Sequence, residues 1–135
     1  MFSTQSAAAY AKVGIETNVS TASPHQLVLM LFDGALLAIN SAAISLANGD
    51  VAAKGSSISK AIEIVTLGLK ASLDGEAGGD LAAHLGSLYD YVCQRLFYAN
   101  LSNSDAALNE AATLLSELRE AWAQIGQQVQ TEQVG

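Results

Sequence analysis

The residue types that most often carry chemistry in proteins are few in this chain and widely spaced. The sequence contains two histidines, His25 and His84, and one cysteine, Cys93. A di-iron helical bundle needs Glu-x-x-His pairs on facing helices, and neither histidine has a glutamate three residues before it. A structural zinc site could be completed here only with carboxylates that are distant in the sequence. The sequence therefore predicts no metal site and no cofactor.

Two acids, Asp33 and Asp90, interrupt otherwise apolar helical segments, and such a pair could act as general acid and general base. A polar strip or a local hydrogen bond explains both acids more simply. Cys93 has no base close to it in the sequence, so we interpret it as an inert, half-buried thiol. The glycines and acids of residues 74–80 match neither a phosphate-binding loop nor an EF-hand. We therefore predict that the protein is not an enzyme.

The composition argues against several other classes of function. The 135 residues include 13 acids and 6 bases, which gives a net charge of −7. Nucleic acids and anionic membrane surfaces are bound through Lys and Arg, so neither is expected as a partner. No uninterrupted apolar run approaches the roughly 18 residues that span a bilayer, and the N-terminus lacks the features of a secretory signal. One cysteine cannot form an intrachain disulfide. Together these features predict a cytoplasmic protein without membrane insertion.

Helical periodicity predicts an all-α fold with helices at about residues 24–47, 51–73, 81–99 and 106–125. The first helix begins with Ser23 as N-cap, Pro24 in the first turn and Gln26 to complete a capping box. It should end before Gly49. We predict an antiparallel four-helix bundle over residues 23–126. Residues 1–22 should form an N-terminal cap segment, with or without a short extra helix. Residues 127–135 should form a disordered tail.

Each predicted helix carries an apolar stripe that should face the core. The stripes consist of Leu27, Val28, Leu31, Ala35, Ala38, Ile39, Ala42 and Leu46 in the first helix; Ile58, Ile62, Val65, Leu69 and Leu73, with Ala61 beside them, in the second; Leu81, Leu85, Leu88, Tyr89, Val92, Leu96 and Ala99 in the third; and Leu108, Ala111, Leu115, Leu118, Trp122 and Ile125 in the fourth.

The first two helices carry more apolar surface than one buried face needs. Met30, Leu37 and Ile44, each seven residues apart, form a second stripe on the first helix, and Ile64 and Leu67 lie off the core stripe of the second. A helix that is apolar nearly all round must be buried all round. In a domain of this size, either helices on both sides or a partner must cover this surface.

Several short motifs, in order and at matching spacing, make residues 10–122 resemble the flagellar secretion chaperone FliS family. The motifs are Tyr10-x-x-Val13, Thr21-Ala22-Ser23-Pro24-x-Gln26-Leu27-Val28-x-Met30-Leu31-Phe32-Asp33-Gly34, Lys60-Ala61, Ser72-Leu73-Asp74, Gly78-Gly79, Leu85-x-x-Leu88-Tyr89-Asp90-Tyr91, Ala99-Asn100-Leu101 and Glu117-Leu118-Arg119-Glu120-Ala121-Trp122. The family usually has Glu where Gln26 stands and Tyr where Phe32 stands. Gln preserves the capping box, whereas Phe removes a hydroxyl.

The resemblance implies a type III export chaperone of the bacterial cytosol, folded as an antiparallel four-helix bundle. It implies that the client is the disordered C-terminal segment of flagellin, which the chaperone keeps from premature polymerisation. It also implies delivery of that client to components of the flagellar export gate. In the family, an N-terminal segment covers the hydrophobic surface that flagellin takes over.

Combining the resemblance with the apolar stripes gives a specific expectation for the site. The expected client-binding surface consists of Met30, Leu37, Ile44, Ile62, Ile64 and Leu67, and the expected cap of Tyr10 and Val13, which share one side of a helical turn. The main alternative is a homodimeric structural or adaptor bundle that buries the same stripes against a second copy. A small-molecule-binding bundle would need a polar cavity, which these stripes do not suggest.

Overall fold

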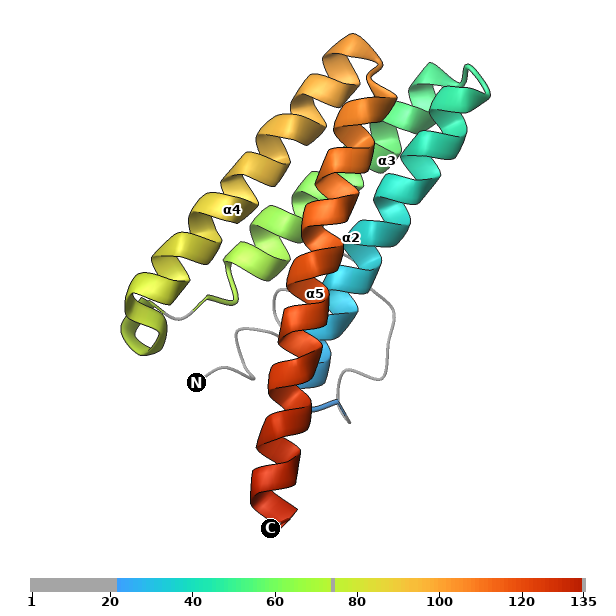
Figure 1. Cartoon of the computed structure of the whole chain (residues 1–135). Helices are drawn as coiled ribbons and strands as arrows, with labels where there is room; N and C mark the ends of the chain where they lie inside the picture. Colours follow the sequence, from blue (N-terminus) through green and yellow to red (C-terminus); the bar gives the residue numbers. More distant parts are fainter. Residues whose placement is uncertain (1–21, 74, 135) are drawn as a thin grey trace.

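The bundle is built from long helices that run alternately up and down, as a computed structural model describing residues 22–73 and 75–134 shows (Figure 1). The elements are α2 (Pro24–Ala47), α3 (Val51–Glu63), the π-helical segment η1 (Ile64–Lys70) that continues α3, α4 (Gly75–Ser102) and α5 (Asp105–Val134). No strand occurs in these described ranges. The predicted all-α, antiparallel fold is confirmed.

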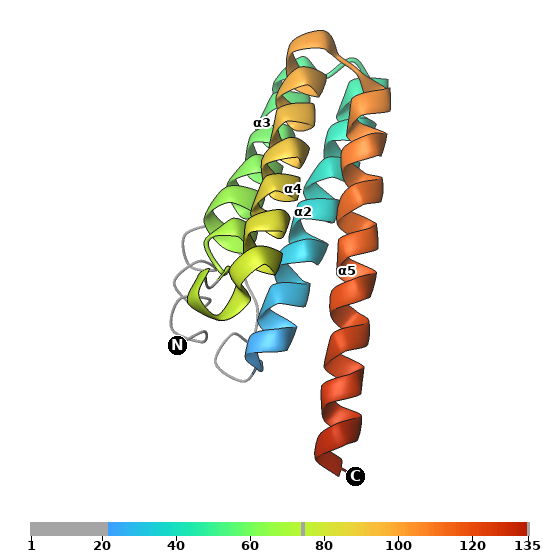
Figure 2. The ribbon, with the colours of Figure 1, turned by 60° about the vertical axis from the view of Figure 1, so that its left-hand side comes forward.

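The helices pack in cyclic order around one core. Each of α2 and α4 has two neighbours: the continuous helix formed by α3 and η1, and the helix α5. Figure 2 shows α5 along one edge of the bundle, with α2 between it and α3. Each helix therefore has two neighbours in the bundle.

The start of α2 follows from its first residues. The Ser23 hydroxyl accepts a hydrogen bond from the Gln26 backbone N–H at 3.1 Å, and the Gln26 side-chain oxygen accepts from the Ser23 N–H at 3.0 Å. This reciprocal pair is the predicted capping box, and Pro24 occupies the first turn as expected. At the other end Gly49 has a φ of 74°, a left-handed conformation in which glycine is favoured.

Most of the predicted stripes form the core, with three informative exceptions. Phe32, which lies outside the predicted stripe, is buried, and its ring centroid is 6.4 Å from that of Tyr89. A phenylalanine at such a site needs no hydrogen-bond partner. Leu81 and Ile125 were expected in the core, but both are exposed, Leu81 by 62%. Leu81 lies just after the break at Gly79, and Ile125 comes one residue before Gly126, where α5 packs on His25, so its side chain lies about 100° around the helix from that contact.

The second predicted helix differs from expectation in its winding and in the width of its buried face. Its last part, Ile64–Lys70, is π-helical, so its turns are wider than those of α3. Ile64, expected off the core stripe, is only 1% exposed. The helix packs against both α2 and α4. Because of these two contacts, Ala61, Ile64 and Gly68 are buried in addition to residues of the predicted core stripe.

Two glycines change the predicted helix ends. Gly79 was expected in a turn, and its backbone torsions are non-helical (φ 54°, ψ −125°). A helical turn comes before it, however, so α4 starts at Gly75 instead of near residue 81. Gly126 does not end the last helix, because α5 continues to Val134. A Cβ at Gly126 would overlap the His25 ring, so this glycine permits close packing of α5 against α2. The backbone of the predicted tail is thus helical as far as Val134.

A buried lysine fixes the end of the bundle that carries the α2–α3 and α4–α5 turns. Lys54 in α3 donates hydrogen bonds to the Asn100 carbonyl at 2.9 Å and to the Asn103 side-chain oxygen at 2.6 Å. Asn103 has a φ of 51°, so the polar contact also holds a strained turn residue. The ammonium lies near the carboxyl end of α4, where a positive charge is favoured.

Among the described helices, α2 alone is long and apolar enough to cross a membrane by length and composition, with a mean hydropathy of 2.0 over its best window. A central helix of a bundle meets the same criterion. Here α2 contributes a buried face, from Leu27 to Ala42, to the core shared with α3, η1 and α5.

Candidate protein-binding groove

The acids considered for chemistry are held apart in separate ion pairs between helices. Asp33 of α2 accepts from Arg119 of α5 at 2.5 Å, and Asp90 of α4 accepts from Lys70 of η1 at 2.7 Å. These pairs are largely exposed, so each contributes at most about 1 kcal/mol to stability. The two carboxylates therefore do not form the general acid–base pair that the sequence left open, and each links two helices instead.

Cys93 and the partly buried His25 also lie in packing contacts between helices. Burial is the main cause that raises the pKa of the Cys93 thiol, whose sulfur lies 3.6 Å from the Thr66 hydroxyl. Burial lowers the pKa of His25, which stacks on Trp122 with ring centroids 4.9 Å apart. The Trp122 indole N–H donates to the His25 carbonyl at 3.0 Å. No group of three or more His, Cys, Asp or Glu side chains could hold a metal within the described residues.

A groove of about 480 Å³ runs between α2 and α3. Most of its lining residues are small or apolar, and they come from both helices and from the start of η1. They are Gly34, Leu37, Ala38, Ser41, Ser56, Ser57, Lys60 and Ile64. The shape and the apolar walls suit a side of another helix better than a small polar molecule.

The structure brings two of the predicted site residues together in this groove, and Ile44 and Leu67 lie outside its lining. Leu37, 67% exposed, and Ile64, almost fully buried, line the same hollow. Ile44 lies two turns further along α2 than Leu37 and is 55% exposed, and Leu67 on η1 is 38% exposed.

The remaining predicted site residues are less accessible or are not described. Met30 and Ile62 are partly buried and pack against the core. Tyr10 and Val13, the expected cap, lie outside the described residues.

Comparison with known proteins identifies the family. A family model described as flagellar protein FliS matches residues 6–129. The chain belongs to the FliS family. It is 51% identical over 125 residues to the flagellar secretion chaperone FliS of Salmonella typhimurium, a match that covers 93% of each chain. The proteins of the same name from Escherichia coli and Bacillus subtilis are 41% and 35% identical, over 90% and 81% of this chain. Membership of this family supports a role as an export chaperone.

Sequence reasoning missed the small residues and the lysine that shape the groove of this FliS family member. Gly34, Ala38 and Ser41 follow one another on α2 at spacings of four and three, so they share one side of the helix. Ser56 lies on the facing side of the groove, in the regular helix α3. Small residues at helical spacing on two adjacent helices were the signal that could have predicted this groove.

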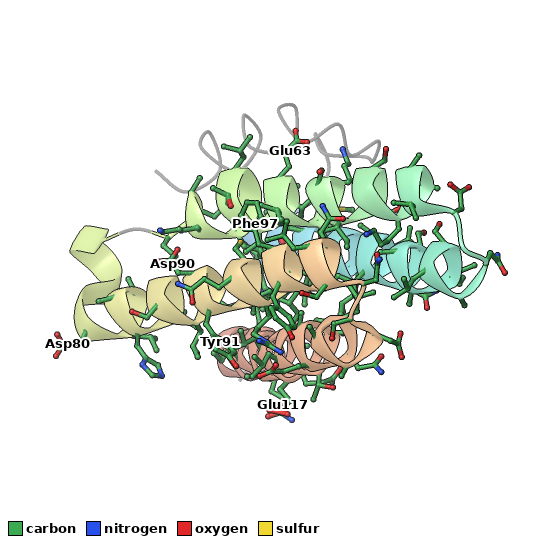
Figure 3. The ribbon with its side chains drawn as sticks, turned by 90° about the horizontal axis from the view of Figure 1, so that it is seen from above. Glu63, Asp80, Asp90, Tyr91, Phe97 and Glu117 are labelled. Carbon is green, nitrogen blue, oxygen red and sulfur yellow. The ribbon has the colours of Figure 1, made fainter. Side chains whose placement is uncertain are left out.

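A second exposed apolar area of the FliS bundle lies on α4. Phe97 and Leu101, four residues apart, are both exposed, and Figure 3 shows Phe97 on the side of α4 toward α3. Tyr91 lies on the side toward α5 and donates a hydrogen bond to Glu110 (Figure 3). This hydrogen bond is the main cause that raises the pKa of the Tyr91 hydroxyl. The Tyr91 hydroxyl thus links α4 to α5.

Proposed function

We propose that this FliS family member is a cytosolic type III export chaperone without catalytic activity or cofactor, whose client is the C-terminal segment of flagellin. By holding that segment, the chaperone would keep flagellin from premature polymerisation and present it to components of the flagellar export gate. The observation that carries the proposal is the apolar groove between α2 and α3, with the exposed Leu37 at its edge, in a chain whose relatives are named flagellar secretion chaperones.

The physics of the groove supports a helical client segment. A disordered segment can fold into an amphipathic helix as it binds, and its apolar face then lies in a groove between two helices. Burying one leucine or isoleucine side chain contributes about 1.5–3 kcal/mol. The exposed side chains of Leu37, Ile44 and Leu67 offer this gain to a partner. The cost of ordering the client reduces the net affinity.

Within this proposal the six predicted residues have two kinds of role. Leu37, Ile44 and Leu67 contact the client directly, because their side chains are exposed. Met30, Ile62 and Ile64 support that surface from beneath, since the first two pack against the core and the third is buried in it. Substitution of the supporting residues should therefore affect folding as well as client binding.

Co-purification with flagellin tests the proposed function. The chain, expressed with full-length flagellin from the same genome, should retain it on an affinity column. Flagellin truncated at its C-terminus should not be retained. Light scattering on the purified chain and on the complex would give the stoichiometry. A stable homodimer that binds no flagellin would overturn the proposal in favour of a structural or adaptor bundle.

We further propose that Tyr10 and Val13, in the segment of residues 1–22, cap the groove in the absence of client. A cap that competes with the client lowers the apparent affinity by the fraction of time for which the groove is closed. Deletion of residues 1–13 should therefore strengthen binding of a flagellin C-terminal peptide, as measured by calorimetry. Unchanged or weaker binding by the deletion variant would contradict the cap.

A further inference from the structure

We infer that Lys60 selects the occupant of the groove by pairing with an Asp or Glu side chain on the apolar helix that binds there. The inference rests on the proposed function and deepens it, because it gives the client segment a chemical signature. The groove would accept a helix with small and apolar residues on one face and one carboxylate opposite Lys60.

Lys60 differs from the other lysines and arginines of the described ranges, 22–73 and 75–134, because its side chain alone forms no ion pair or hydrogen bond. Lys70, Arg95 and Arg119 are paired with Asp90, Glu110 and Asp33 across helix contacts. Lys54 is buried and donates to Asn100 and Asn103. In a chain with a net charge of −7, a cation without a carboxylate partner is available to an external acid.

The position of Lys60 places this charge in the groove. Lys60 is the one charged residue among those that line it, and it lies one turn before Ile64 on the same helix. Lys60 also lines a second hollow, of about 680 Å³, on the α4 side of α3. It therefore stands on the ridge between the two hollows, and its side chain is only partly exposed.

The groove walls explain why a single charge can discriminate between partners. Small residues on both helices, such as Gly34 and Ser56, let a partner helix approach closely and displace water. In a site that excludes water, an ion pair is stronger and a like charge is more costly than at an open surface. The net charge of −7 disfavours a carboxylate elsewhere on the chain, so Lys60 would fix the register in which an acidic helix binds.

Substitution of Lys60 by glutamine tests this inference, with Lys70→Gln as the matched control. Both changes remove one positive charge, but Lys70 lies outside the groove and is paired with Asp90. Lys60→Gln should weaken binding of the flagellin C-terminal peptide about tenfold, and Lys70→Gln should change it less than about twofold. Added salt should weaken binding to the wild-type chain more than binding to the Lys60→Gln variant.

A double-mutant cycle then identifies the partner carboxylate. Each Asp and Glu of the peptide is replaced in turn by Asn or Gln, and each peptide is measured against both the wild-type chain and Lys60→Gln. One replacement should weaken binding to the wild-type chain and have almost no further effect on binding to Lys60→Gln. If the wild-type chain binds the peptide but Lys60→Gln binds it equally well, the inference is wrong and the proposed function stands. If the wild-type chain does not bind flagellin, the proposed function itself fails.

Discussion

Replacing Leu37 with aspartate should reduce the affinity for the flagellin C-terminal segment about 100-fold, with helicity and melting temperature near those of the wild type. The lost burial of leucine and the desolvation of a carboxylate each oppose binding, and together they amount to about 3 kcal/mol. Because Leu37 is largely exposed in the free chain, the substitution should change the free energy of unfolding by less than about 0.5 kcal/mol. Calorimetric titration and thermal melting followed by circular dichroism measure the two quantities.

A matched control tests whether the loss of binding is specific to the groove or follows from any exposed apolar residue that is replaced by aspartate. Leu81, at the start of α4, is exposed to a similar extent, but it does not line the groove. Leu81→Asp should therefore leave both binding and melting close to the wild type. Ile44→Asp should behave like Leu37→Asp, since Ile44 lies on the same side of α2. If Leu37→Asp unfolds the domain, Leu37 is a core residue and its proposed role is wrong.

The second large effect concerns the contact between α2 and η1. Leu31 is fully buried, and Leu31→Ala should lower the free energy of unfolding by about 2–5 kcal/mol. A Cβ added at Gly68 would lie 2.7 Å from Leu31 Cδ2. Gly68→Ala should therefore destabilise the wild-type chain by about 1–2 kcal/mol, because overpacking outweighs the gain in helix propensity. In the Leu31→Ala background, the same change should instead stabilise the chain, because the new methyl group fills part of the cavity.

Urea denaturation of the two single variants and the double variant measures this coupling. Gly55→Ala provides the control, because a Cβ there would meet only the Asn100 side-chain oxygen, at an ordinary 3.8 Å. We expect Gly55→Ala to stabilise the chain by up to about 1 kcal/mol. Strictly additive effects of Leu31→Ala and Gly68→Ala would show that the two residues do not limit the approach of α2 and η1.

The helix ends that could be predicted from the sequence are those formed by capping residues that are close together in the sequence. The capping box at Ser23 and Gln26 and the left-handed Gly49 bound α2 without help from the rest of the fold. Gly126 could not be interpreted in this way, because its importance comes from the His25 ring, which is distant in the sequence. A glycine that ends a helix and a glycine that allows close packing look the same in the sequence.

The proposed client-binding surface could be predicted in part from the apolar residues of the first two helices. An apolar residue with no place on the core stripe indicates a surplus surface, and this reasoning identified Leu37 and Ile44. It also assigned Ile64 to that surface, because periodicity does not tell how wide a buried face is when a helix has two neighbours. Lys60 belongs to a family motif but was not predicted as a site residue, since a lysine on an amphipathic helix is usually solvated. Its role is suggested only by the absence of a partner within the described residues and by its position in the groove.

The contact of Trp122 and Gly126 with His25 has a consequence for the proposed cap. This contact, together with the Asp33–Arg119 pair, holds the first turns of α2 against α5, so Ser23 is a fixed anchor for the chain that precedes it. Tyr10 precedes that anchor by 13 residues, a tether of at most about 45 Å. A cap joined to the groove by so few residues would have an effective local concentration on the order of millimolar. Competition from the proposed cap would therefore not depend on the concentration of the chaperone, and occupancy of the groove would follow the concentration and the affinity of the client.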